Sequence, residues 1–510
     1  MEYGRNRINK SRMLTVLCIL LMVFVCGQGA FAAAMTDTQI SNAVDDEMIE
    51  ENGVDADEIT VNALDGIVTL NGTVDSILEK DRAEKIALTV KGVRSVVNKV
   101  TVSPVVYHTD TEIAEDVEDA FIYNPVTESW EITSRVKDGV VNLSGSVDSW
   151  QEKEIAAKVA KGVKGVKGID NDITVEYEVE RPDNEIEEEI EAALKWDILI
   201  DHGLLTVKVK NNDVTLSGYV GSAAEKNRAK AKAWVAGVNF VSADAVKVKW
   251  WARNDKLRKN KYTNKDDKSV KQAIKDAFLY DPRVNMFNVE VDVDNGVATL
   301  RGTVNNLKAK RAAADDARNT LNVWRVKNRI KIAGDLPSDE KVENDVEAAL
   351  IADPYVERYE LTVTVLDNEV YLSGDVTTQF EKAQAEFVAS GITGVSEVHN
   401  NIQVSDGEAL TYDPYYDYWN PDAFDWYEYP EFTVETDWEI RQDLNEIIEW
   451  SPYLESDEIT VEVEDGKAIL SGEVETWYDL RRASEAALEA GAVSVDNNLN
   501  VDYGPDDYEG

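Results

Sequence analysis

The stretch Asp138-Gly139-Val140-Val141-Asn142-Leu143-Ser144-Gly145-Ser146-Val147 decides the fold of this chain. Its Asp-Gly pair favours a two-residue hairpin turn of type I′, because both central positions of that turn need a positive φ. After the turn, Val141, Leu143 and Val147 alternate with polar residues, which predicts a strand with one apolar face. Gly145 lies on that face, and a glycine there indicates that another backbone or a helix packs closely against it.

The same pattern occurs six times, and each copy has one marker glycine, which we interpret as structural. Successive marker glycines are 73, 73, 84, 72 and 98 residues apart. A fixed period with two longer intervals indicates tandem repeats with two insertions. The marker glycines are Gly72, Gly145, Gly218, Gly302, Gly374 and Gly472.

Each copy also has helical and further strand signals around the hairpin. In the second copy, Ile113, Val117 and Phe121 fall on one helical stripe, and Thr109-Asp110 just ahead can cap that helix. A second helix, rich in Ala and Lys, is predicted after the hairpin at 152–161, and a last strand closes the unit. We therefore predict an α+β fold of six tandem α-β-β-α-β domains, each a three-stranded mixed sheet with two helices on one face.

Three features of the second copy carry a family resemblance: the 138–147 core, the Gly162-Val163-x-Gly165-Val166 exit, and the closing Asn171-x-Ile173-x-Val175. On these residues the unit resembles the BON domain, named for bacterial osmotic-shock and nodulation proteins, and the chain is similar to the periplasmic OsmY family. The third and fifth copies depart from the pattern, since their turns read as Asn212-Asp213 and Asn368-Glu369.

The resemblance covers almost all of the chain beyond its N-terminus. It implies a non-enzymatic role in envelope maintenance under osmotic or related stress, through contact with phospholipid or unfolded envelope proteins. The expected ranges are a signal peptide at 1–34, repeats at 36–104, 109–178, 183–249, 267–334, 338–406 and 436–503, a basic linker at 250–266 and an acidic aromatic linker at 407–435.

The N-terminus is typical of an export signal. Basic residues precede an apolar stretch from Met13 to Val25, and cleavage is expected near Ala32 or Ala34. Both cysteines lie in the part to be removed, and Val25 occupies the place before Cys26 where a lipoprotein signal has a small residue. We therefore expect export to the periplasm or another envelope compartment, and no other segment long enough to span a membrane.

The formal net charge of −45, from 53 Lys and Arg against 98 Asp and Glu, argues against nucleic acid as a partner. One strongly basic run interrupts this acidic chain after the third repeat. It is either a linker that pairs with the chain's own acidic domains or a contact for anionic phospholipid or an envelope protein. The candidate contact residues are Trp250, Trp251, Arg253, Lys256, Arg258, Lys259 and Lys261.

The second insertion, 407–435, is crowded with Tyr, Trp, Asp and Pro. So many aromatic residues favour docking, either on a neighbouring repeat or on a ligand such as a carbohydrate.

No pattern of catalytic or metal-binding residues stands out. The three histidines, His108, His202 and His399, lie in different repeats without paired spacing, and there is no phosphate-binding loop or Gly-x-Ser-x-Gly elbow. We expect no catalytic residue, no metal and no cofactor. The competing hypothesis to phospholipid or client binding is a structural scaffold that binds another envelope protein with no role for lipid.

Overall fold

The structure is a computed structural model of the 510-residue chain. The expected signal peptide, the whole acidic aromatic linker and most of the basic linker lie outside the residues that it describes. It describes residues 35–501 except 51–52, 125, 128–131, 178–180, 254–264, 286, 324, 333–335, 358, 378, 405–436, 452–453, 455–457, 465, 475–476, 491 and 493.

Each repeat has two helices, which flank the hairpin in sequence. The first helices all begin at an aspartate: α2 (Asp37–Glu50), α4 (Asp110–Tyr123), α6 (Asp183–Trp196), α8 (Asp267–Leu279), α11 (Asp339–Ala352) and α13 (Asp437–Trp450). The second helices are α3 (Ile77–Thr89), α5 (Trp150–Lys161), α7 (Ala223–Lys232), α10 (Leu307–Arg318), α12 (Gln379–Ser390) and α14 (Trp477–Glu489). A short helix, α9 (Pro282–Asn285), follows α8.

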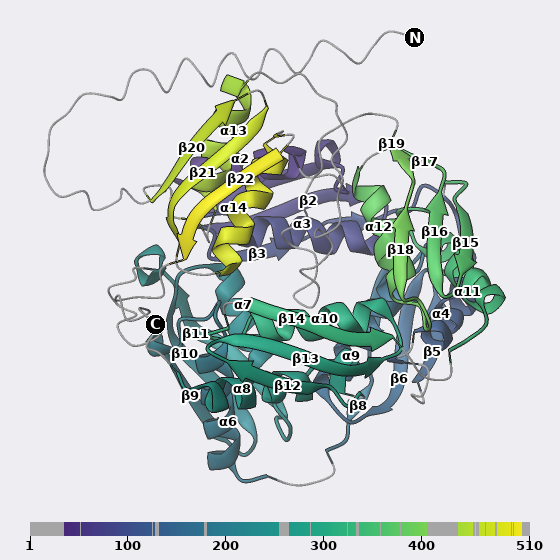
Figure 1. The fold of residues 1–510 in the computed structure, drawn as a ribbon, viewed down its shortest axis with the longest axis horizontal. Coiled ribbons are helices and arrows are strands. Elements are labelled where there is room, and N and C mark those ends of the chain that lie inside the picture. Colours follow the sequence, from purple (N-terminus) through teal and green to yellow (C-terminus); the bar gives the residue numbers. More distant parts are fainter. Residues whose placement is uncertain are drawn as a thin grey trace, which may run out of the picture. The chain divides into compact units, whose positions relative to one another are not determined.

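The strands of each repeat form one small sheet (Figure 1). The first strands are β1 (Ile59–Leu64), β5 (Ile132–Lys137), β9 (Leu205–Lys210), β12 (Glu290–Asp294), β15 (Thr362–Leu366) and β20 (Ile459–Glu464). The second are β2 (Ile67–Val74), β6 (Val140–Val147), β10 (Asp213–Val220), β13 (Val297–Val304), β16 (Glu369–Ser373) with β17 (Asp375–Val376), and β21 (Lys467–Val474). The last are β3 (Ser95–Asn98) with β4 (Thr101–Val102), β7 (Gly168–Asn171) with β8 (Thr174–Val175), β11 (Phe240–Val248), β14 (Arg325–Ile332), β18 (Glu397–Asn400) with β19 (Gln403–Val404), and β22 (Ser494–Val501).

The second hairpin strand is the centre of every sheet. In the fourth repeat, β13 pairs antiparallel with β12 and in parallel with β14, so the sheet is mixed. The other repeats have the same two pairings. This confirms the predicted α+β class with three-stranded mixed sheets.

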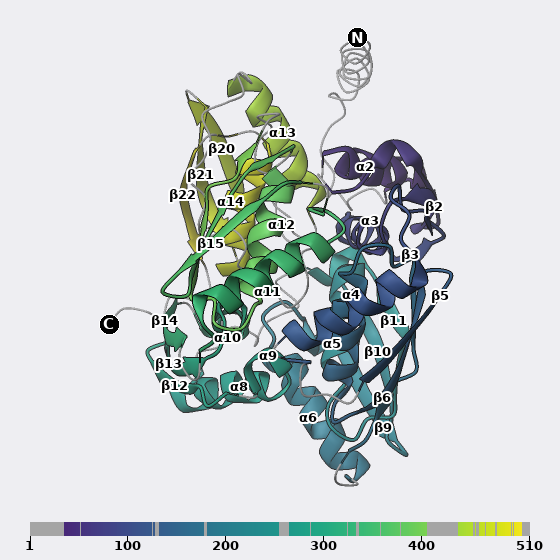
Figure 2. The same ribbon diagram turned by 90° about the vertical axis from the view of Figure 1, so that its right-hand side faces the viewer.

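Both helices of a repeat lie on the same side of its sheet, as Figure 2 shows for α4 and α5 against β5 and β6. The apolar residues predicted from the sequence meet there, and Ile113, Val117, Leu143, Ala156 and Ile173 are all buried in one core. Because the helices cover only one face, the opposite face of each sheet is left for contacts outside the repeat.

Two hairpin turns lie one residue earlier than the sequence predicted. In the third repeat the turn residues are Asn211 and Asn212, with φ of 54° and 64°, and in the fifth they are Asp367 and Asn368, with φ of 52° and 64°. Asn and Asp tolerate this left-handed conformation because their short polar side chains bond locally to the backbone. The turns therefore keep their geometry although glycine is absent.

A carboxylate from the first helix holds each turn. Thr109 caps α4 in a capping box with Glu112, as expected, which leaves Asp110 for another role. The two carboxylate oxygens of Asp110 accept the backbone N–H groups of Asp138 and Gly139, both at 2.9 Å. The equivalent aspartates are Asp37, Asp183, Asp267, Asp339 and Asp437.

We expect Asp110→Asn to lower the melting temperature of the protein by a few degrees at pH 7, because an amide offers one acceptor where the carboxylate offers two. The hydrogen bonds from Gly139 and Asp138 lower the pKa of Asp110, so its contribution is present above pH 4 and is lost as pH falls through its folded pKa. The difference between variant and parent should therefore shrink in strong acid. Circular dichroism melts measure it, with Glu118→Gln on the exposed face of the same helix as control.

Candidate functional site

Aromatic side chains gather on the uncovered sheet face of the third repeat. Trp251, in a short 3₁₀ helix (Trp250–Arg253), lies with its ring centroid 5.1 Å from that of Tyr219 on β10. Trp251 is 49% exposed and Tyr219 38% exposed, while Phe240, 57% exposed, lies at the opposite end of the sheet, at the start of β11. Large aromatic rings left in solvent beside one another mark a contact surface.

Of the seven candidate residues in the basic run, the structure describes the side chain of Trp251. The short helix includes Trp250 and Arg253, whose side chains are not described, and Lys256, Arg258, Lys259 and Lys261 lie outside the described residues. Tyr219 and Phe240 were not predicted from the sequence. The sequence signal that could have identified them is the alternation of each strand: the inward positions are apolar, and Tyr219 and Phe240 occupy outward positions.

The first repeat has an uncharged apolar patch on its uncovered sheet face. Leu64 and Ile67 face each other across the hairpin of β1 and β2, at 72% and 40% exposure. Val97 on β3 adds a third apolar side chain, 41% exposed. These three side chains are apolar, so this patch differs from the charged surface expected of so acidic a chain, although Lys99 lies further along the same face.

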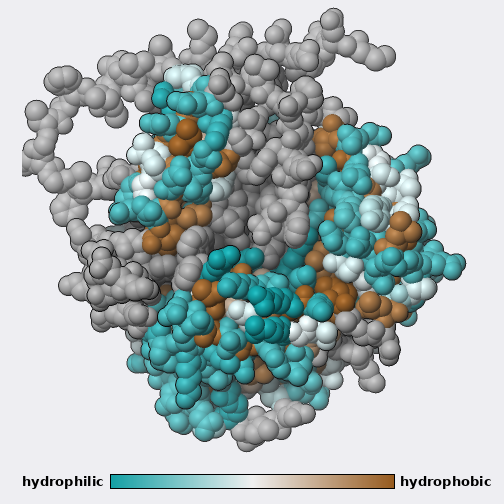
Figure 3. All heavy atoms as spheres, in the orientation of Figure 1, coloured by the Kyte–Doolittle hydropathy of each residue, from teal (hydrophilic) through white to brown (hydrophobic). Residues whose placement is uncertain are grey.

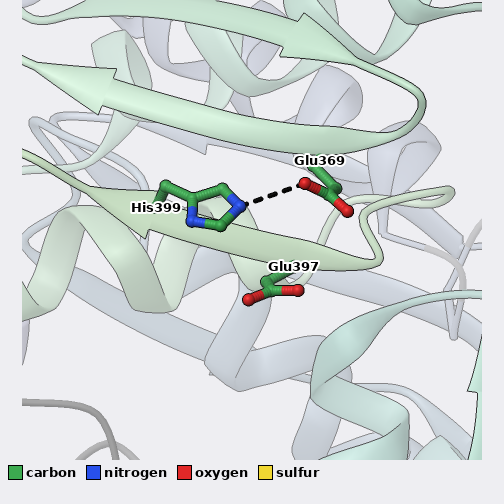
Figure 4. A group of neighbouring side chains, drawn as sticks. All are labelled: Glu369, Glu397 and His399. Carbon is green, nitrogen blue, oxygen red and sulfur yellow. Dashed lines mark hydrogen bonds and ion pairs between the residues drawn. The ribbon is translucent and has the colours of Figure 1, made fainter.

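Two of the histidines lie beside carboxylates. His108 is 3.5 Å from Glu357, and His399 lies on the uncovered face of the fifth repeat. His399 on β18 and Glu369 on β16 are 3.1 Å apart, and the donor atoms of Glu369, Glu397 and His399 all lie within 4.8 Å of one another (Figure 4). Tyr371 stacks on His399 with 4.4 Å between centroids and donates a hydrogen bond to Glu369.

Imidazole and carboxylate groups are suitable ligands for a divalent cation such as Zn²⁺. On an open sheet face, however, a cation bound by these three residues would remain largely solvated. The hydrogen bond and the stacked ring already account for the positions of Glu369 and His399. The absence of a metal site, expected from the sequence, stays a prediction.

Within the compact unit Asp37–Gly510, helices of the first, second, fourth and fifth repeats line a cavity of about 640 Å³. Five acids line it, Asp81, Asp116, Asp119, Glu154 and Asp353. Asp81 pairs with Lys161 at 2.5 Å, while Asp353 accepts a hydrogen bond from Gln384 at 2.7 Å. Burial raises the pKa of Asp353 to about 6, although the hydrogen bonds that it accepts from Gln384 and from the backbone of Tyr355 and Val356 act to lower it.

At the marker glycines of the fourth and fifth repeats a backbone carbonyl oxygen lies close to where a Cβ would be. In the fourth repeat a Cβ on Gly302 would lie 2.6 Å from the carbonyl oxygen of Asn288, just before the first strand, and in the fifth a Cβ on Gly374 would lie 2.9 Å from that of Glu360. Their φ values are 134° and 143°, which L side chains rarely adopt. The sequence predicted a close approach at this position. The approaching group is the backbone carbonyl that lies two residues before the first strand of the same sheet.

The fold and these surfaces define a tandem array of small α+β domains. The model of the BON domain family matches residues 36–104, 109–177, 182–249, 266–334, 338–406 and 436–503. The chain therefore belongs to the BON domain family and carries six copies of the domain.

Among individual proteins, the chain is 32% identical over 145 residues to osmotically-inducible protein Y of Escherichia coli K12. This alignment covers 27% of this chain and 72% of that protein. Two solved structures of CdsD, a structural protein of the type III secretion system of Chlamydia trachomatis, align at 15% and 14% identity. They cover 41% and 44% of this chain, and 91% and 100% of theirs, with a TM-score of 0.12 each, too low to carry an argument. Among the residues that the structure describes, every helix is too short or too polar to cross a bilayer.

Proposed function

We propose that this chain is a non-enzymatic protein of the periplasm or another exported envelope compartment that protects the envelope under osmotic stress by binding anionic phospholipid. The observation that carries the proposal is the exposed pair of Tyr219 and Trp251, which adjoins the basic run 253–261. Trp and Tyr favour the membrane interface, and nearby Lys and Arg attract anionic headgroups. Membership of the BON family and the likeness to an osmotically-inducible protein support the stress-related role.

Sedimentation with vesicles tests the proposal. The chain without residues 1–34 is mixed with vesicles of equal parts phosphatidylglycerol and phosphatidylcholine, and separately with phosphatidylcholine alone. We expect binding to the anionic vesicles only, and we expect Trp251→Ala to weaken it about tenfold, because one interfacial Trp is removed. Phe240→Ala is the control. This exposed ring lies at the start of β11, next to the hairpin turn, whereas Tyr219 and Trp251 lie at the other end of the sheet. An absence of binding at low salt would reject lipid as the partner.

The uncharged patch of Leu64, Ile67 and Val97 favours a second candidate function, binding of an unfolded client or an envelope protein. Exposed apolar side chains at this density are typical of protein contacts. If the patch binds an unfolded client, Leu64→Lys abolishes suppression of aggregation of a reduced client protein and leaves vesicle binding unchanged. Leu366→Lys, an exposed change at the corresponding hairpin position of the fifth repeat, is the matched control.

A further inference from the structure

The uncovered sheet face of the fourth repeat carries a row of cations. Arg325, Lys327, Arg329 and Lys331 alternate along β14, and all four side chains are exposed. Because alternate residues of a strand are about 6.6 Å apart, the row is about 20 Å long. Arg301 on the central strand is the direct cross-strand neighbour of Arg329 and is also exposed. Figure 3 shows strongly hydrophilic surface in the region where Figure 1 places β13 and β14.

These five cations have no acidic partner among the residues that the structure describes, either as an ion pair or as a hydrogen bond. The acids on this face, Glu290, Asp292 and Asp294, lie on β12. Glu290 is the direct cross-strand neighbour of Arg301 on β13, but no acid of this sheet lies on a strand next to β14. Two strand spacings put β12 about 10 Å from β14, which is about one Debye length at physiological salt. The field at β14 is therefore positive, although the chain as a whole carries −45.

The other repeats are internal controls, and they show that the fold does not need this charge. In place of Arg301 they have Asn71, Ser144, Ser217, Ser373 and Ser471. At the four positions of the β14 cations, the first repeat has Ser95, Val97, Lys99 and Thr101, the second Gly168, Asp170, Asp172 and Thr174, the fifth Glu397, His399, Asn401 and Gln403, and the sixth Ser494, Asp496, Asn498 and Asn500.

Basic residues on an edge strand also prevent the pairing of that strand with another chain. That role does not require Arg301, because Arg301 is on the central strand. The corresponding edge strands of the other repeats fulfil the same role with one cation or none. The accumulation of five cations on one flat face of one repeat thus indicates a partner with a flat array of negative charge.

We infer that the face formed by Arg301, Arg325, Lys327, Arg329 and Lys331 is a docking surface for an anionic lipid bilayer. The choice of lipid rests on the proposed function. A bilayer surface is flat over this length and presents a phosphate at each headgroup, so it matches a rigid row of cations without a cleft. The contact is electrostatic, since the outward residues of the central strand beside the row, such as Thr299 and Thr303, are not large apolar groups. It is separate from the aromatic pair of the third repeat.

The test compares two triple variants of the full chain without residues 1–34. The first, Lys327→Gln/Arg329→Gln/Lys331→Gln, removes three charges from the row. The control, Lys230→Gln/Lys268→Gln/Lys275→Gln, removes three charges from exposed positions on the helices α7 and α8. Circular dichroism melts verify that both variants fold. Partition into vesicles of phosphatidylglycerol and phosphatidylcholine is measured by sedimentation from 50 to 300 mM salt.

We expect the row variant to lose about tenfold or more of its affinity and to show a weaker salt dependence, whereas the control loses less than about twofold. Equal losses in both variants would overturn the inference, because net charge alone would then explain them. If the parent chain binds vesicles and the row variant binds them equally well, the inference is overturned and the proposed function stands. If the parent chain binds no vesicles, both are rejected. A dimer of the parent chain that the row variant dissociates, without vesicle binding, would assign the face to an acidic protein partner instead.

Discussion

Gly218→Val should unfold the third repeat at temperatures where the parent protein is folded. Gly218 has a φ of 124°, and a Cβ at this position would overlap the carbonyl oxygen of Leu204. Valine destabilises the folded state in two ways. It forces a backbone conformation that β-branched residues avoid, and it displaces the carbonyl of Leu204, at the end of the short 3₁₀ helix His202–Leu204 that leads into β9. We expect a loss of about 4 kcal/mol in the free energy of unfolding, which is in the range of severe single substitutions.

The matched control for this variant is Gly203→Ala in the same repeat. At Gly203 the nearest atom to an added Cβ is an oxygen of Asp201 at 3.9 Å, so the methyl group meets only ordinary contact. Hydrogen–deuterium exchange of the peptides that contain β9 and β10 localises the effect. Protection of these strands in Gly218→Val equal to that in Gly203→Ala would show that the marker glycine is not required by the fold.

Arg228→Met should be the most damaging of the charge substitutions in the third repeat. Arg228 on α7 donates from Nε to both carboxylate oxygens of Asp197 at 2.8 Å, and the side chains are 11% and 2% exposed. Removing one partner of a buried pair leaves the other charge uncompensated, which costs about 3–5 kcal/mol. The remaining cation, Lys232, is 3.8 Å from Asp197 and compensates only in part.

The pH dependence of this variant has an opposite sign to that of the parent. Burial alone would raise the pKa of Asp197, but the charges of Arg228 and Lys232 lower it below its ordinary value. In the parent this contribution is therefore present above pH 4 and is lost as pH falls through the folded pKa. In Arg228→Met burial dominates and raises the pKa, so stability is regained as pH falls from 7 to 5.

Chemical denaturation at pH 7 and pH 5 measures both effects. The control is Lys271→Met, which breaks the exposed pair of Lys271 and Asp292, 3.6 Å apart, and should cost less than about 1 kcal/mol. A loss for Arg228→Met no larger than for Lys271→Met would mean that the buried pair contributes no more than a surface one.

Much of the fold could be predicted from the sequence, because its signals are local. The alternation of Val141 and Leu143, the helical stripe of Ile113 and Phe121, and the marker glycines each need only a few consecutive residues to be recognised. These periods predicted six mixed sheets with two helices on one face, and the structure confirms them. The turns at Asn211-Asn212 and Asp367-Asn368 were misplaced by one residue, since Asn and Asp fit several turn positions equally well.

The candidate surfaces were less visible, because each depends on residues brought together by strand pairing. The sequence pointed to the contiguous basic run and missed Tyr219, which comes to lie beside Trp251 only across the sheet of the third repeat.

By itself, then, the sequence determined the repeat, its order of elements and its apolar cores, since the periods of helices and strands are written in neighbouring residues. The tertiary structure alone decided that Asp110 holds a turn 28 residues away. It also decided that Arg301 stands next to Arg329 in a row of cations on one uncovered face. The packing of α4 on the sheet sets the first contact and the register between β13 and β14 sets the second. Both are fixed by the packing of the whole repeat and not by any short stretch of chain.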